Sequence, residues 1–101
     1  MFKAKEIIGN AMALSAGCVN EENESDFLDL LNLAISDLSD IAVCEPFKVA
    51  DIEEAVNLDA KYYAVLSYMT AAHIAFKREN LDLAALYQIS ALSILDMFGK
   101  E

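Results

Sequence analysis

Apolar side chains recur every three or four residues along most of the chain, and most regularly between Phe27 and Ile41. This spacing places them on one side of an α-helix, because a helix turns through about 100° per residue. Three glycines and one proline leave few breakers for the many turns of a β-rich fold. The sequence therefore predicts an all-α fold, a small bundle of about four helices in a single domain over residues 1–101.

Two helices are expected before residue 47. The first spans about 3–16, and Gly17 is expected to end it in the left-handed conformation that glycine adopts easily. The second spans about 26–43 and ends before Pro46, because the residue preceding a proline is pushed out of the helical region. The apolar stripe of this second helix consists of Phe27, Leu30, Leu31, Ala34, Leu38 and Ile41.

Two further helices are expected after residue 58. The third begins after Asn57 or Asp59, either of which is a good N-cap, and it ends near Asn80. It has apolar residues on two sides, which is typical of a central helix. Its main stripe consists of Tyr62, Val65, Leu66, Met69 and Phe76. The fourth helix spans about 81–98, with Asn80 as its cap and Gly99 after its end.

The segment 47–58, between the second and third helices, has no clear periodicity. We expect an irregular loop that carries one or two turns. A short extended segment or hairpin is the alternative.

The fourth expected helix has large apolar residues on both of its sides. The core side consists of Leu83, Ala84, Tyr87, Ala91, Ile94, Leu95 and Phe98. Leu86, Ile89 and Met97 fall on the other side, among acidic and serine residues. Monomeric proteins rarely leave such a patch uncovered. We therefore predict that Leu86, Ile89 and Met97 bind a protein partner, unless the loop at 47–58 folds over them.

Charge and composition narrow the kinds of partner. The net charge is −10, and between Glu21 and Asp59 there are twelve acids and a single base, Lys48. Such a surface repels nucleic-acid phosphates and anionic membranes, so we expect neither as a direct partner. No apolar run approaches the roughly 20 residues of a membrane helix. The apolar fraction of 56% exceeds that of an ordinary domain, which favours burial against other chains.

The sequence gives no pattern for catalysis or for a cofactor. His73 is the only histidine, and no metal-ligand spacing surrounds it, so we expect no metal site and a structural role for this residue. Cys18 and Cys44 lie in no CxxC arrangement and are expected to be reduced structural thiols, as in the cytoplasm. The prediction is a protein that is not an enzyme and needs no cofactor.

Five segments together resemble small virion proteins of tailed phages and prophages, of the head–tail connector or head-completion type. They are 27–32 (FLDLLN), 56–59 (VNLD), 62–72 (YYAVLSYMTAA), 78–80 (REN) and 84–87 (AALY). The chain departs from that pattern because it lacks a clear hairpin between residues 43 and 58. The resemblance implies a ring subunit between portal and tail, a homo-oligomer or a contact of other virion components, located in the bacterial cytoplasm or the virion.

Two other function classes fit the same sequence. One is an acidic regulatory module, inhibitor-like or antitoxin-like, that masks a basic partner protein. The other is a small-molecule-binding bundle with a pocket lined by Tyr62, Met69 and His73. A ring or large oligomer would favour the virion protein, and a monomer or dimer that binds a basic protein would favour the regulatory module.

Overall fold

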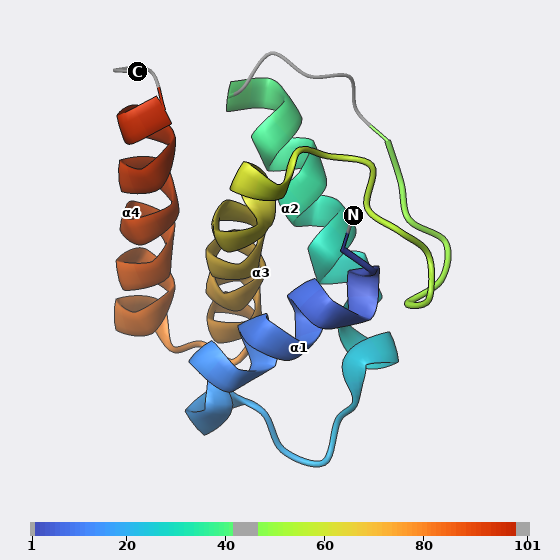
Figure 1. Cartoon of the computed structure of the whole chain (residues 1–101). Helices are drawn as coiled ribbons and strands as arrows, with labels where there is room; N and C mark the ends of the chain where they lie inside the picture. The colour runs from blue at the N-terminus through green and yellow to red at the C-terminus, as the bar shows by residue number, and fades with distance from the viewer. Residues whose placement is uncertain (1, 42–46, 99–101) are drawn as a thin grey trace.

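Four helices make up most of the computed structural model, which describes residues 2–41 and 47–98. They are α1 (Ala4–Leu14), α2 (Leu28–Ile41), α3 (Tyr63–Lys77) and α4 (Leu81–Phe98), and short 3-10 turns occupy Ala16–Cys18, Glu24–Phe27 and Ala60–Tyr62. Helix α3 is central and packs against the other three helices (Figure 1). The described ranges contain no strand, so the fold is the all-α bundle that the sequence predicts.

The core lies where α1, α2 and α3 meet. Its largest fully buried side chains are Phe27, Ile7, Ile8, Leu31, Ile35, Leu38, Leu66 and Ile74. The predicted stripes of the second and third helices supply half of these residues: Phe27, Leu31, Leu38 and Leu66. Their burial stabilises the fold, because apolar area removed from water contributes about 25 cal/mol per Å². Two members of the predicted stripes, Ile41 and Phe76, are exposed instead. The predicted end of α2 at residue 43, together with Cys44, Pro46 and Gly99, lies outside the described residues.

The first helix ends differently from the prediction. Gly17 does not take the left-handed conformation, because no glycine among the described residues has a positive φ. Ser15 ends α1 instead: its N–H and its hydroxyl both donate to the Ala11 carbonyl, at 3.0 and 2.6 Å. The chain then tightens into the 3-10 turn Ala16–Cys18, in which the Cys18 N–H donates to the Ser15 carbonyl at 2.8 Å. The buried Ser15 therefore ends the helix in place of Gly17.

Side-chain caps lie at or just before the starts of the later helices. Before α2, the Asn23 side chain accepts the Ser25 N–H at 3.1 Å, and Asp26 accepts the Asn23 N–H at 2.8 Å. This reciprocal arrangement satisfies backbone donors that a helix start leaves unpaired. Asp59 accepts the Lys61 N–H at 3.1 Å, and Asn80 accepts the Leu83 N–H at 3.3 Å. The predicted cap of the fourth helix is therefore confirmed. Asp59 caps the 3-10 turn Ala60–Tyr62 that leads into α3, and α3 itself has no side-chain cap.

The segment 47–58 is an irregular loop with a turn, as we expected, and it docks on the N-terminal end of α1. The Ala4 and Lys5 N–H groups donate to the carbonyls of Glu54 and Ile52, at 2.8 and 2.9 Å. The Val56 N–H donates to the Phe2 carbonyl at 2.7 Å. Lys3, the N-cap of α1, makes no side-chain cap, so the loop carbonyls take the place of a capping side chain.

Asn32 of α2 fastens the other end of this loop. Its amide group donates to the Val49 carbonyl at 2.9 Å, and its side-chain oxygen accepts the Val49 N–H at 2.8 Å. One side chain thus pairs both backbone groups of a buried residue, which would otherwise lose their hydrogen bonds to water. The loop is held between α1 and α2.

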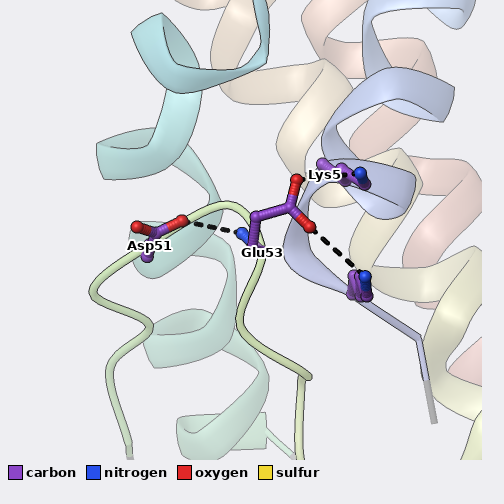
Figure 2. Close-up of polar contacts among 4 residues, drawn as sticks. Lys5, Asp51 and Glu53 are labelled. Atoms are coloured by element: carbon purple, nitrogen blue, oxygen red, sulfur yellow. Dashed lines mark hydrogen bonds and ion pairs between the residues drawn. The ribbon is translucent and has the colours of Figure 1, made fainter.

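Two exposed ion pairs add to the loop contact. Figure 2 shows the Glu53 carboxylate between the loop and α1, where it accepts from Lys5 at 2.8 Å and from Lys3 at 3.2 Å. Asp51 accepts the Glu53 N–H at 2.8 Å and so positions the turn. The hydrogen bonds from Lys5 and Lys3 hold the pKa of the Glu53 carboxyl below its ordinary value, and the Glu53 carboxylate raises the pKa of Lys5.

Candidate interaction surface

Helix α4 presents most of its surface to solvent. It lies along α3 at one edge of the bundle (Figure 1), and among its residues only Ala84 and Ala91 are buried. Small side chains at the contact, including the buried Ala71 and Ala75 of α3, let the two helices approach closely. The Tyr87 hydroxyl also donates to the Leu14 carbonyl, which links α4 to the end of α1.

The three residues predicted to bind a partner are all exposed on α4. Leu86, Ile89 and Met97 are 55%, 62% and 65% exposed. At about 100° per residue, Leu86, Ile89 and Met97 all point away from the buried Ala84 and Ala91. The alternative expectation, that the 47–58 loop covers these residues, is wrong. The loop lies at the opposite edge of the bundle from α4 (Figure 1), because α1 and Asn32 hold it there.

We expected no apolar run of membrane-helix length, and α4 contains no uninterrupted run of that length although it meets a looser criterion. Leu81–Phe98 is long and apolar enough to cross a membrane by length and composition only. The sequence argument looked for an uninterrupted apolar run, and Asp82, Ser90, Ser93 and Asp96 interrupt this one. A helix of a protein bundle meets the same criteria when it carries apolar residues on its exposed side as well as on its packed side. Length and composition therefore do not decide whether α4 contacts a membrane or a protein.

A groove runs between α2 and α4, over α3. Its volume is about 470 Å³, and it is lined by Asp37, Asp40, Ile41, Met69, Ala72, His73, Phe76, Ala84, Gln88 and Leu92. Three large apolar residues of this lining, Ile41, Phe76 and Leu92, are exposed. Sequence reasoning placed Ile41 and Phe76 in the core, since periodicity shows which side of a helix is apolar but not whether another element covers that side.

A hydrogen-bonded pair in the lining of the groove joins α3 to α2. The His73 Nε2 lies 2.8 Å from the Asp37 Oδ2, and the His73 side chain is partly buried. His73 is therefore held by a partner from another helix, and the structural role expected for it stays a prediction. The pocket expected for a small-molecule-binding bundle is present only in part, because Met69 and His73 line the groove whereas Tyr62 does not.

Elsewhere in the described part of the chain, few side chains that could bind a metal or react lie close together. Within residues 2–41 and 47–98, no three His, Cys, Asp or Glu side chains lie close enough to hold a metal ion. Cys18 is buried and accepts from the Asn80 amide group at 3.7 Å. The apolar surface of α4 and the adjoining groove are thus the candidate sites for binding a partner.

No protein-family model matches this chain, and the searches of curated proteins and of solved structures also give no match. The resemblance to phage connector proteins stays a prediction from the segments quoted above.

Proposed function

We propose that this protein is a structural assembly subunit that binds other protein chains through the outward side of α4 and catalyses no reaction. The exposure of Leu86, Ile89 and Met97 on one helix carries the proposal. Each of these side chains would contribute roughly 1.5–3 kcal/mol to a contact that buried it fully. The other side of α4 already packs on α3, so a partner could bind without disturbing the bundle.

The specific form that we propose is a subunit of a homo-oligomer, of the kind found in phage head–tail connectors. The sequence resemblance supports the connector, and the apolar excess of the chain supports self-association. In this form, the outward side of α4 contacts an identical subunit or the next virion component. The alternative is an acidic module that binds a basic protein as a monomer or dimer.

A protein partner accounts for α4 better than a membrane does. The net charge of −10 opposes binding to an anionic leaflet, and both Asp82 and Asp96 lie within the helix itself. Ala84 and Ala91 are buried against the bundle, so insertion of α4 would also expose the side of α3 that it covers. A docked protein needs neither change.

Replacing Leu86 and Ile89 together with serine tests this proposal. We expect the natural chain to form an oligomer in light scattering, and the double variant to become smaller while its melting temperature stays nearly constant. Leu33→Ser is the matched control, because Leu33 is an exposed leucine of α2 outside α4 and the groove. A natural chain that stays monomeric at all concentrations and sediments with lipid vesicles would contradict the proposal. So would a large loss of stability without any change in association.

A further inference from the structure

We propose that the groove between α2 and α4 binds one amphipathic helix of a different protein, and that this helix carries lysine or arginine beside its apolar anchors. The surface is distinct from the outward side of α4, so the inference does not rest on the proposed function. It would add a second contact, made with a basic partner.

The spacing of the lining residues fits a helical guest. Met69, Ala72, His73 and Phe76 of α3 follow the pattern i, i+3, i+4, i+7, and Ala84, Gln88 and Leu92 of α4 follow i, i+4, i+8. Such positions lie along one line of a helix, so the groove runs lengthwise over about two turns, roughly 10 Å. α2 and α4 form its two walls and α3 its floor. A helix laid lengthwise would pack its apolar side against all three.

The apolar residues of the groove would anchor the partner helix. Ile41, Phe76 and Leu92 come from three different helices and are all exposed, although each lines the groove. Phe76 is 65% exposed, which is a large apolar area to leave in water. One helix in the groove would contact all three side chains at once. α1 covers α3 and α2 elsewhere in the bundle, and nothing in the described ranges covers this position.

The negative charges of the groove favour a partner helix with positively charged side chains. Asp37 and Asp40 line the groove, and among the described residues no lysine or arginine does. Asp37 already faces His73, whereas Asp40 has no basic partner among the described residues. A guest lysine or arginine beside Asp40 would form an ion pair at the edge of an apolar contact, where it determines orientation and association rate.

The same charges argue against a second copy of this chain as the guest. The most apolar exposed helix that a copy could offer is α4, and residues 81–98 contain two aspartates and no base. Its insertion would bring Asp82 or Asp96 toward Asp37 and Asp40. Like charges brought together in this way oppose the contact. A basic helix from another protein has complementary charge.

The proposal can be tested with a model peptide. A fluorescent helix of about 14 residues, or four turns, would carry leucine at i, i+3, i+4 and i+7 and lysine at the flanking positions. A second peptide would carry glutamate in place of lysine. Titrated with the full chain in an anisotropy assay, the lysine peptide should bind about tenfold more tightly than the glutamate peptide, because like charges are costly in a contact.

Matched variants assign the binding to the groove. Phe76→Ser should weaken binding of the lysine peptide by about tenfold, the effect of losing one anchoring side chain. Asp40→Asn should weaken it by about threefold, as for a partly exposed ion pair. Leu33→Ser and Asp29→Asn replace an exposed leucine and an exposed aspartate outside the groove and should leave binding unchanged. Leu86→Ser should also leave it unchanged, which separates this site from the outward side of α4.

Several outcomes would overturn the inference. Equal binding of the two peptides would show that charge does not select the guest. Equal losses for Asp29→Asn and Asp40→Asn would show a diffuse attraction to the acidic surface. Amide chemical shifts mapped with the lysine peptide should change at Ala72, His73 and Gln88, and changes confined to other positions would place the peptide elsewhere. Loss of oligomerisation in the Leu86 and Ile89 variant, with peptide binding retained, would leave both proposals standing.

Discussion

The two sides of α3 are built differently. On one side, α1, α2 and the 47–58 loop enclose fully buried side chains and are joined by backbone hydrogen bonds from residues far apart in sequence. On the other side, α4 is packed along one face and keeps large apolar residues in water. The first region has what a stable fold needs, and the second has what an interface needs. The comparison predicts that the first region contributes most of the stability, and we propose that the second contacts another protein.

Paired substitutions of leucine give the largest test of this difference. Leu38 is fully buried and Leu86 is more than half exposed. We expect Leu38→Ala to lower the free energy of unfolding by about 2–5 kcal/mol, since it removes buried methyl groups and leaves a cavity. Leu86→Ala should change it by less than about 0.5 kcal/mol, as for a surface position. Urea denaturation at one low protein concentration measures both, and similar losses would show that α4 is part of the core.

The attachment of the loop is the next test. Asn32→Ala removes both hydrogen bonds to the backbone of Val49 and leaves its buried N–H and carbonyl unpaired. We expect a loss of about 1–3 kcal/mol in the free energy of unfolding. Asn57→Ala is the matched control, because Asn57 is an exposed asparagine of the same loop. If both variants lost the same stability, the Asn32 contact would contribute nothing of its own.

Local signals predicted the helices well. Asp59 marked the 3-10 turn that leads into α3, and Asn80 marked the start of α4, because a capping side chain acts within three residues of its own position. Leu86, Ile89 and Met97 were placed on the exposed side of α4 by counting 100° per residue. The prediction that Gly17 ends the first helix was wrong, although it also rested on a local signal. The Ser15 hydroxyl and N–H both donate to the Ala11 carbonyl, and α1 ends two residues earlier than predicted.

Contacts between residues far apart in the chain could not be predicted from the sequence. The bonds from Asn32 to Val49 join residues 17 apart through an irregular loop, and neither residue type implies the pairing. The groove was missed for a related reason. Ile41 and Phe76 follow the apolar period of their helices, but whether they are covered depends on how α2 and α4 lie on either side of α3. Periodicity contains no information on that arrangement.

The smallest expected effect concerns pH and again separates the two regions. The pKa of Glu53 is lowered in the folded chain, chiefly by the hydrogen bond from Lys5 and then by that from Lys3. A carboxyl group with a lowered folded pKa stabilises the fold above its ordinary pKa of 4.5, and this contribution is lost as the pH falls through the folded value. The ion pairs are exposed, so the contribution is small.

Glu53→Gln should therefore lower the melting temperature slightly at pH 7, and the difference from the natural chain should vanish at a pH below the folded pKa of Glu53. The same substitution should also remove the raised pKa of Lys5, whose contribution to stability is present below 10.5 and disappears as the pH rises through its folded value. Glu21→Gln, an exposed glutamate with no contact to the loop, is the control and should show neither effect. A difference between Glu53→Gln and the natural chain that persisted in acid would mean that Glu53 positions the loop by packing and not by charge.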